Sequence, residues 1–270
     1  MGHEIKTIGI LGAGNMGTAI IAGLCSQGSS NIIHVHDIDE SRVTLLAEKY
    51  SIKAEKNTES LCGSSDVIII AVKPDMVPGI LDQLRICWSD EKILVCIAAG
   101  ITTAAIEKRL GSSVKVIRVM PNTPALAGKG MSVLSPGSAA DDKAMEVTDS
   151  IFRAIGRTSR LPEKLMDSVT GLSGSGPAYV FTFIQALTDA GVKEGIPRDT
   201  ALLLAAQTVL GSAQLVLENM EDPFTLRGRV TSPGGTTIAG IHVLEKAGFS
   251  GIVMDAVEAA VKKSRSIGEQ

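Results

Sequence analysis

The stretch Gly12-Ala13-Gly14-Asn15-Met16-Gly17 decides the fold of this 270-residue chain. It follows a short apolar run at residues 5–11, which is typical of a buried parallel strand, and it precedes a run at residues 18–24 that favours a helix. Strand, glycine turn and helix together are the setting in which a GxGxxG motif marks a dinucleotide-binding site. The alternative is a tight turn that binds no ligand.

Each glycine of this motif has an expected role at a dinucleotide site. Gly12 permits the tight turn, Gly14 lets the backbone approach a pyrophosphate, and Gly17 lets the helix lie close to the strand. The N–H groups and the positive dipole end of the helix then face the phosphates. Asn15 and Met16 lie between the last two glycines and are therefore candidate cofactor-binding residues as well.

Composition excludes several classes of partner. The chain is 44% apolar and 20% charged with a formal net charge of −3, so no basic surface for nucleic acid or an anionic membrane is expected. One Trp, two Tyr and five Phe are too few to suggest base-stacking platforms. No apolar run reaches the roughly eighteen residues that a membrane span needs.

The cysteines and the N-terminus predict a cytoplasmic protein. Cys25, Cys62, Cys87 and Cys96 form no CxxC pair and lie in or beside apolar segments, so they are expected to be reduced core residues. The N-terminus lacks the charged and apolar regions of a signal peptide. The four histidines show no ligand or relay spacing, and we expect no bound metal and no catalytic histidine.

Strand-like and helix-like segments alternate along the first part of the chain. The expected strands after the first are residues 32–37, 67–72, 93–98, 115–120, 131–134 and 157–161. The expected helices between them are residues 39–50, 74–88, 102–110 and 141–155. This βαβ alternation is typical of a doubly wound, mostly parallel sheet. We therefore expect an α/β dinucleotide-binding domain at residues 1–162 and an all-α domain at residues 163–270.

Three loops leave the carboxyl ends of expected strands, where ligands bind on such a sheet. They are residues 71–74, 98–101 and 120–124. Proline and glycine could simply end the strands, but their shared edge with the glycine turn favours a common cleft. Asn122, flanked by two prolines, is the best polar candidate, and its alternative role is an Asx turn. The candidate cofactor-binding residues in these loops are Ala71, Val72, Lys73, Pro74, Ala98, Gly100 and Asn122.

Asp37 ends the second expected strand, 20 residues beyond Gly17. A carboxylate at this spacing can accept hydrogen bonds from the ribose hydroxyls of NAD, and it would repel the 2′-phosphate of NADP. The alternative is that Asp37 or Asp39 caps the following helix. Arg42 lies nearby and could accommodate a phosphate. The expected cofactor is therefore NAD(P)H, and Asp37 favours NADH.

After Pro162 the strand signal stops, and the rest of the chain is expected to be almost wholly helical. Residues 171–177 are rich in glycine and serine and predict a flexible turn or helix break, after which Pro177 opens a helix. The expected helix at residues 198–217 is apolar on every side, and such a helix must be buried all round. We expect a second subunit to cover it; the alternative is burial against the chain's own helices.

A second candidate anion site precedes the expected helix at residues 238–246. Residues 231–237 combine a helix start, four hydroxyl side chains and two glycines that leave room for a small carboxylate. The backbone N–H groups expected to be free there are those of Gly234, Gly235, Thr236 and Thr237. The alternative is that Ser232 caps the helix and Pro233 takes its first position.

These motifs together resemble the pyrroline-5-carboxylate reductase family over the length of the chain. The segments that carry the resemblance are residues 12–17, 71–74, 120–124, 171–179 and, most specifically, 232–240. The resemblance implies an N-terminal Rossmann domain and a C-terminal helical dimerisation domain, with homodimers that often assemble into decamers. It also implies reduction of the C=N bond of Δ1-pyrroline-5-carboxylate, a small imine, to L-proline by NAD(P)H in the final step of proline biosynthesis.

The resemblance further assigns substrate-binding and catalytic candidates. It implies an active site between one subunit's cofactor and the helical domain of its partner. Thr237 matches a family residue that contacts the ring end of the substrate, and Thr237 and Ser232 are the candidate catalytic residues. The candidate substrate-binding residues are Ser175, Ser232, Gly234, Gly235, Thr236 and Thr237.

One departure weighs against a neighbouring class of enzyme. Residues 171–176 also resemble the substrate-domain motif of β-hydroxyacid dehydrogenases, in which a lysine follows the last glycine by four residues. Val180 occupies that position here. A carbonyl reductase needs an acid to protonate the developing alkoxide, whereas a cyclic imine can arrive already protonated. A β-hydroxyacid-type dehydrogenase and a non-catalytic NAD-binding protein are the alternative functions.

Overall fold

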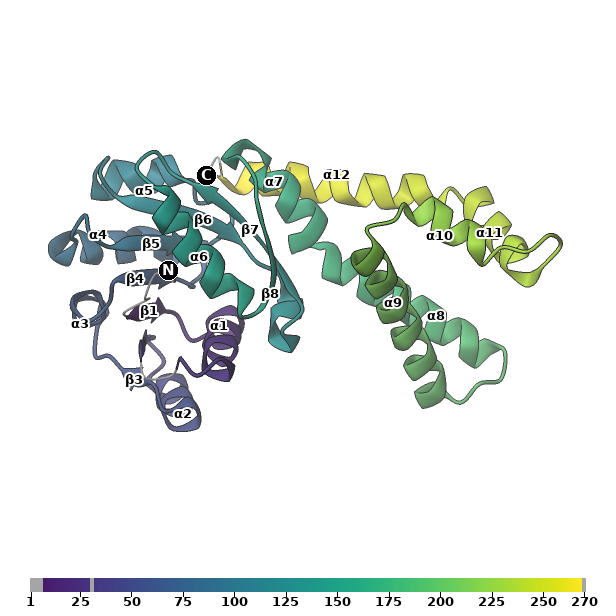
Figure 1. Cartoon of the computed structure of the whole chain (residues 1–270), viewed down its shortest axis with the longest axis horizontal. Coiled ribbons are helices and arrows are strands. Elements are labelled where there is room, and N and C mark those ends of the chain that lie inside the picture. Colours follow the sequence, from purple (N-terminus) through teal and green to yellow (C-terminus); the bar gives the residue numbers. More distant parts are fainter. Residues whose placement is uncertain (1–6, 30–31, 269–270) are drawn as a thin grey trace. The chain divides into compact units, whose positions relative to one another are not determined.

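The computed structural model describes residues 7–29 and 32–268 of the chain (Figure 1). Residues 5 and 6 of the expected first strand lie outside these ranges. Internal contacts divide the chain into an α/β unit, which runs to Ser175 and resumes at Ala259, and a helical unit, Gly176–Glu258. The boundary expected after residue 162 coincides with the end of the sheet, whereas the contacts place the boundary after Ser175. Residues beyond the sheet stay with the α/β unit because Met166 and Val169 pack against Val133.

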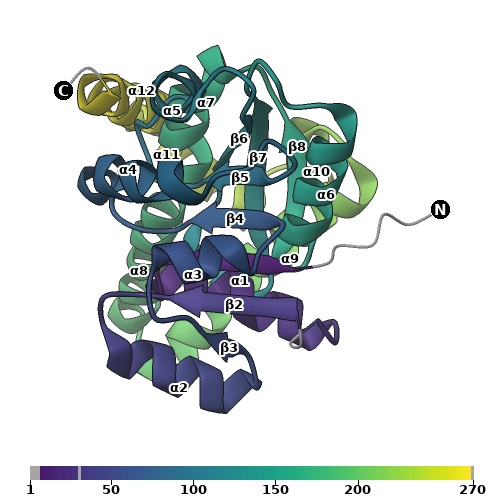
Figure 2. The same ribbon diagram turned by 90° about the vertical axis from the view of Figure 1, so that its left-hand side faces the viewer.

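One eight-stranded sheet forms the α/β unit, in the order β3-β2-β1-β4-β5-β6-β7-β8 (Figure 2). The strands are β1 (Ile8–Leu11), β2 (Ile33–His36), β3 (Lys53–Ala54), β4 (Val67–Ile70), β5 (Ile93–Cys96), β6 (Lys115–Met120), β7 (Gly130–Pro136) and β8 (Gly156–Arg160). Neighbouring strands pair in parallel except β6 and β7, which run antiparallel. The expected doubly wound, mostly parallel sheet is thus confirmed. Its order reverses at β1, which makes the carboxyl end of β1 the switch point where such sheets bind ligands.

Six helices connect the strands of this sheet. They are α1 (Asn15–Ser26), α2 (Glu40–Tyr50), α3 (Thr58–Gly63), α4 (Val77–Cys87), α5 (Thr103–Leu110) and α6 (Asp142–Arg153). Four of these helices begin at a side chain that accepts a backbone N–H, namely Asp39, Asn57, Thr102 and Asp141. Such a cap contributes about 1 kcal/mol and fixes where the helix starts. The expected limits of α5, Thr102 before it and Gly111 behind it, are confirmed.

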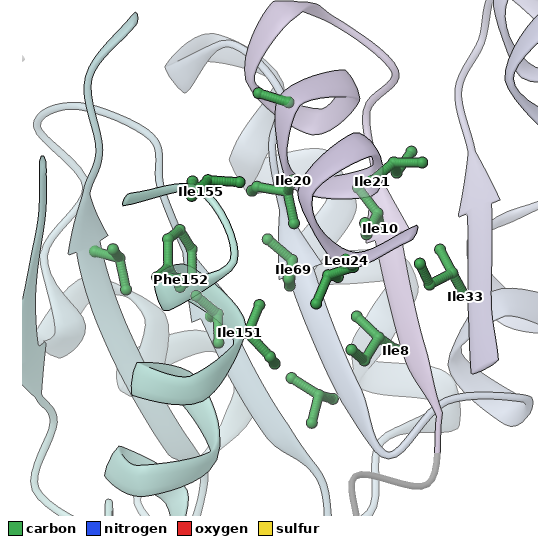
Figure 3. Close-up of a cluster of buried hydrophobic side chains, with 14 of the residues drawn as sticks. Ile8, Ile10, Ile20, Ile21, Leu24, Ile33, Ile69, Ile151, Phe152 and Ile155 are labelled. Atoms are coloured by element: carbon green, nitrogen blue, oxygen red, sulfur yellow. The ribbon is translucent and has the colours of Figure 1, made fainter. Parts of the chain in front are cut away.

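Two apolar layers bury the sheet on both faces. One layer packs residues of α1, α2 and α6 on the sheet and includes Ile20 and Phe152 (Figure 3). The other packs residues of α3, α4 and α5. Successive residues of β4 alternate between the layers, with Ile69 in the first and Ile68 and Ile70 in the second. Each such isoleucine, wholly shielded from solvent, stabilises the fold by about 1.5–3 kcal/mol.

The sequence did not predict β3 and α3, which are short and largely polar. β3 pairs with β2 over two positions, and His34 lies opposite Lys53. This pairing brings Nδ1 of His34 within 2.7 Å of Oε1 of Glu55, so a buried histidine does meet a carboxylate. The spacing of the histidines cannot reveal such a pair because the sheet, and not a helix turn, joins its members.

The glycine- and serine-rich segment is helical rather than a flexible turn. α7 (Met166–Val169) continues directly into a π-helical segment, Thr170–Gly174, and after a bend at Ser175 the chain enters α8 (Gly176–Lys193). The N–H of Ser175 donates to the carbonyl of Thr170 across five residues, at 2.8 Å. The expected break is therefore one wide turn inside a helical run, with Pro177 in the first turn of α8 as predicted.

The helical unit leaves much of its apolar surface uncovered. It contains α8, α9 (Arg198–Asn219), α10 (Pro223–Arg229), α11 (Thr236–Lys246) and the first half of α12 (Phe249–Gly268). α8 packs against α9, where Ala201 and Ala205 are buried. The remaining faces of α9 are open, and Leu203 is 67% exposed and Leu210 54% exposed. The alternative, burial of α9 against the chain's own helices, is therefore wrong for most of its surface.

The four cysteines have free thiols, as expected for a reduced protein. Cys62 and Cys96 are buried, and this burial raises the pKa of Cys62 to about 12 and that of Cys96 to about 11. Both thiols are therefore protonated, and thus poor nucleophiles and poor metal ligands, at neutral pH.

Candidate functional site

The glycine turn lies at the switch point and has the geometry that its three glycines predict. Gly12 has a φ of +111°, and a Cβ there would lie 2.5 Å from the carbonyl oxygen of Ala71. A Cβ on Gly17 would overlap the carbonyl oxygen of Gly12, so only glycine lets α1 approach the turn this closely. A Cβ on Gly14 would meet no other heavy atom within 4 Å. The backbone at Gly14 thus faces open space, which fits the close approach of a pyrophosphate to the start of α1.

Asp37 is bound to the glycine turn itself. Its Oδ2 accepts the N–H of Ala13 at 2.6 Å, and its Oδ1 accepts the N–H of Asp39 at 2.9 Å. Asp39, not Asp37, caps α2, because its side chain accepts from the N–H of Arg42. Two backbone donors therefore hold the Asp37 carboxylate in one orientation beside the turn.

A cleft of about 210 Å³ opens beside the turn, at the carboxyl ends of β4, β5 and β6. It is lined by Met16, Ala71, Val72, Pro74, Ile97, Ala98, Ala99, Met120 and Pro121. The three expected loops thus share a cleft, and five of the candidate residues lie in its wall. Ile97, Ala99, Met120 and Pro121 were not among the candidates, although Pro and Gly signals mark the loops that contain or adjoin them.

Three of the candidates in these loops lie outside this wall. Lys73 is exposed next to it. Gly100, with a φ of +78°, packs against the end of α12, where a Cβ would lie 3.2 Å from Cγ2 of Ile267. The side chain of Asn122 makes no cap bond to the turn that follows it. Its Oδ1 accepts the N–H of Met131 at 2.8 Å, and its Nδ2 donates to the carbonyl of Ser173 at 3.0 Å. Contacts of these residues with a cofactor remain predictions.

The second candidate site is the loop that leads into α11, in the helical unit. The helix begins at Thr236, with Gly235 as its cap and no side-chain cap bond, so Ser232 and Pro233 do not take the capping positions. The N–H of Gly235 donates to the carbonyl of Ser232 at 3.1 Å and is not free as expected. The N–H groups of Thr236, Thr237 and the next residue open the helix and have no partner within it. A Cβ on Gly235 would overlap Oγ of Ser232 and lie 3.2 Å from the Ser232 carbonyl oxygen, so a side chain there would displace the Ser232 hydroxyl.

A groove of about 530 Å³ continues from this loop along α11. It is lined by Gly234, Gly235, Ile238, Ala239, Ile241, His242 and Glu245. Its mixture of a helix start and apolar side chains suits a small molecule with one carboxylate and an apolar ring. Ser175, the remaining substrate candidate, lies at the bend before α8 and is half-buried.

Comparison with known proteins accounts for both halves of the chain. A family model described as pyrroline-5-carboxylate reductase dimerisation matches residues 163–267, and one described as NADP oxidoreductase, coenzyme F420-dependent, matches residues 7–100. A pyrroline-5-carboxylate reductase of Pisum sativum is 42% identical over 264 residues, which cover 97% of this chain and 96% of the relative. The chain belongs to the pyrroline-5-carboxylate reductase family.

Solved structures of pyrroline-5-carboxylate reductases have the same fold. The enzyme of Coxiella burnetii superimposes with a TM-score of 0.94 at 32% identity and covers 99% of this chain and 100% of its own. The Plasmodium falciparum enzyme, with NADP bound, gives a TM-score of 0.88 at 33% identity with the same coverage. The expected Rossmann domain and helical dimerisation domain are therefore confirmed.

Family membership also bears on the open faces of α9. Within residues 7–29 and 32–268, α9 is the one helix long and apolar enough to cross a membrane, with a hydropathy of 1.6. The dimerisation model of the pyrroline-5-carboxylate reductase family includes this helix. The chain is therefore a homo-oligomer.

Proposed function

We propose that the chain reduces the C=N bond of Δ1-pyrroline-5-carboxylate to L-proline with NAD(P)H, the final step of proline biosynthesis. The observation that carries the proposal is 42% identity to a pyrroline-5-carboxylate reductase over 97% of the chain. Both sites fit this reaction. The glycine turn offers the cradle for the dinucleotide, which supplies the hydride when bound, and the α11 loop offers a site for a carboxylate.

The residues of the α11 loop bind and orient the imine. Its carboxylate is remote from the reacting carbon and serves as the handle, held by the N–H groups that open α11 and by the hydroxyls of Ser232 and Thr237. Gly234 leaves room for it, because a Cβ there would meet no atom within 4 Å. A hydroxyl can donate a hydrogen bond but is a weak acid, so these two residues position a substrate that arrives protonated rather than supply its proton.

Two subunits complete each active site in this proposal. The dinucleotide turn lies in the α/β unit and the carboxylate loop in the helical unit, and the dimerisation model covers the helical unit. The expected assembly is a homodimer that can associate further into a decamer, in the cytoplasm. No cluster of three or more His, Cys, Asp or Glu side chains suited to a metal occurs within the described ranges, and the proposed reaction uses none.

A spectrophotometric assay tests the reaction directly. Purified protein, NADH or NADPH, and pyrroline-5-carboxylate should give loss of absorbance of the reduced cofactor and formation of proline. Absence of turnover with both cofactors would overturn the proposed function. A β-hydroxyacid supplied with the oxidised cofactor is the control for the alternative class of enzyme. No turnover of it is expected, because Val180 stands where that class has its lysine.

Replacing Thr237 with alanine tests the carboxylate loop. The KM for the imine should rise about ten- to hundredfold, because a hydrogen bond to a charged group contributes about 1.5–3 kcal/mol. The KM for the dinucleotide should change less than about twofold. Thr44→Ala on α2 is the matched control, because its exposed hydroxyl bonds only the carbonyl of Glu40. Equal changes in both KM values would argue against a carboxylate site at this loop.

The proposed cofactor is NADH rather than NADPH. The Asp37 carboxylate cannot swing away from the ribose site without losing the N–H bonds from Ala13 and Asp39. Nε of Arg42 pairs with Oδ2 of Asp39 at 3.0 Å, so part of its charge is already balanced by a carboxylate. A relative from Plasmodium falciparum holds NADP, so the preference depends on the residues at this site in each chain.

Replacing Asp37 with asparagine should narrow the preference for NADH. Asparagine keeps the size of the side chain and one acceptor for Ala13 but removes the charge. The ratio of kcat/KM for NADH to that for NADPH should fall at least about tenfold, because opposing two like charges costs several kcal/mol. Steady-state kinetics with both cofactors give the ratio. A wild-type preference for NADPH, or an unchanged ratio in the variant, would refute this role of the carboxylate.

A further inference from the structure

Asn122 joins three segments of the α/β unit that are far apart in the sequence. It follows β6, and its Oδ1 accepts the N–H of Met131 at the start of β7, at 2.8 Å. Its Nδ2 donates to the carbonyl of Ser173, 51 residues further along the chain, at 3.0 Å. Ser173 belongs to the π-helical segment Thr170–Gly174. One amide therefore links the end of β6, the start of β7 and the π segment.

The local turn does not need this side chain. Asn122 precedes a short 3-10 turn, Thr123–Ala127, and makes no side-chain cap bond to it. The turn is closed instead by the backbone, where the N–H of Ala125 donates to the carbonyl of Asn122 at 3.1 Å. The role of the amide is thus at the longer range. The amide oxygen can accept from an N–H while the amide nitrogen donates to a carbonyl, whereas an ionised carboxylate of the same size can only accept.

The π segment that Asn122 holds supports one wall of the cleft. A Cβ on Gly174 would lie 2.7 Å from Cε of Met120, so this glycine packs closely on the methionine. Met120 and Pro121 line the cleft at the end of β6. A π-helical turn widens a helix by one residue and is frequent at functional sites. Here the wide turn brings the Ser173 carbonyl to Asn122 and Gly174 to Met120.

This wall belongs to the nicotinamide half of the dinucleotide site. The acidic residue after β2 of such a sheet contacts the ribose of the adenosine half, and the pyrophosphate lies at the glycine turn after β1. The other mononucleotide must then extend over the opposite side of β1, along β4, β5 and β6. Met120 and Pro121 lie at the far strand of that series.

We propose that Asn122 is a positioning residue for the nicotinamide end of the cofactor. It acts through the backbone of the π segment and through Met120, without touching the reacting atoms. This inference rests on the proposed dinucleotide-dependent function and adds a residue that sets the wall of the cleft. Loss of the Nδ2 donor should disturb the nicotinamide end and leave the adenosine end unchanged.

Asn122→Asp is the variant that isolates this donor. The carboxylate can still accept from Met131, but it cannot donate to the Ser173 carbonyl and repels it. Calorimetry on the full chain should show NADH binding weakened at least about tenfold and ADP-ribose binding unchanged within about twofold, because ADP-ribose lacks nicotinamide. Asn57→Asp on α3 is the matched control, since that side chain only accepts, from the N–H of Ser60.

A purely structural role predicts a different pattern. In that case the midpoint of thermal unfolding falls while NADH and ADP-ribose weaken together or not at all, and this outcome would overturn the proposal. If Asn122→Asp does not fold, Gly174→Ala tests the same wall of the cleft, because its methyl group would lie 2.7 Å from Cε of Met120 and displace that side chain. The same split between the two ligands is expected. Binding is measured without the imine, so a wild-type chain that binds NADH but makes no proline contradicts the proposed reaction alone.

Discussion

Replacing Glu163 with alanine should destabilise the protein by about 3 kcal/mol, because the change leaves a buried guanidinium without its partner. Oε1 of Glu163 lies 3.3 Å from Nη1 of Arg118, whose side chain is only 6% exposed. The same carboxylate accepts the N–H of Thr103 at 2.8 Å and its hydroxyl at 2.5 Å. Glu163 thus satisfies both a strand residue and the start of α5. Urea-induced unfolding at a fixed protein concentration measures the loss.

Two comparisons separate the buried charge from a general surface effect. Asp82→Ala breaks the exposed pair between Asp82 and Arg109 at 3.0 Å and should cost less than about 1 kcal/mol. Replacing Arg118 by methionine in the Glu163→Ala background removes the uncompensated charge and should restore part of the stability. Equal losses for Glu163→Ala and Asp82→Ala would show that Arg118 does not depend on Glu163.

The sequence pattern predicted seven of the eight strands, all but β3, and it placed the glycine turn directly after β1. Buried parallel strands are continuously apolar, as in β4, and the glycines at 12 and 17 admit no side chain because backbone atoms occupy that space. The loops at residues 71–74, 98–101 and 120–124 had to share an edge, because parallel strands end on the same side. These constraints act over a few residues, so a local pattern can reveal them.

The sequence pattern could not predict side-chain contacts between residues that are far apart in the chain. Nothing local indicates that Asp37 bonds Ala13, that Glu163 meets Arg118, or that Asn122 reaches Ser173. β3 and α3 were missed because two paired residues and a six-residue helix carry too little periodicity. The segment at residues 171–177 was predicted to be a flexible turn or a helix break; the structure has a π-helical segment followed by a bend at Ser175, and Gly174 lies close to Met120.

For α9, the sequence predicts that the helix is buried, and the structure shows which of its faces the chain itself leaves exposed. The helix is apolar on every side, so burial was predicted, but no pattern states what buries it. The structure shows that α8 covers only part of it, with Leu203 and Leu210 exposed. The dimerisation model of the family matches residues 163–267, a range that includes this helix.

Replacing Gly14 and Gly17 in turn with alanine should affect the protein in different ways. Gly14→Ala should leave the free energy of unfolding within about 0.5 kcal/mol of the wild type. Its φ of −73° and ψ of −172° suit alanine, and its Cβ would meet no atom within 4 Å. Binding of NADH should nevertheless weaken at least about tenfold, because the methyl group occupies the space that the pyrophosphate must approach.

Gly17→Ala should lose stability as well as binding. Its Cβ would overlap the carbonyl oxygen of Gly12, and a backbone atom cannot move aside as a side chain can. Such overpacking costs about 1–3 kcal/mol and shifts α1 away from the turn. Calorimetry with NADH and urea unfolding at one protein concentration measure both effects for both variants. Wild-type affinity in Gly14→Ala would mean that the pyrophosphate does not lie at this turn. Gly14 has room for a methyl group and Gly17 does not. A loss of NADH binding without a loss of stability in Gly14→Ala therefore means that the methyl group clashes with the bound ligand.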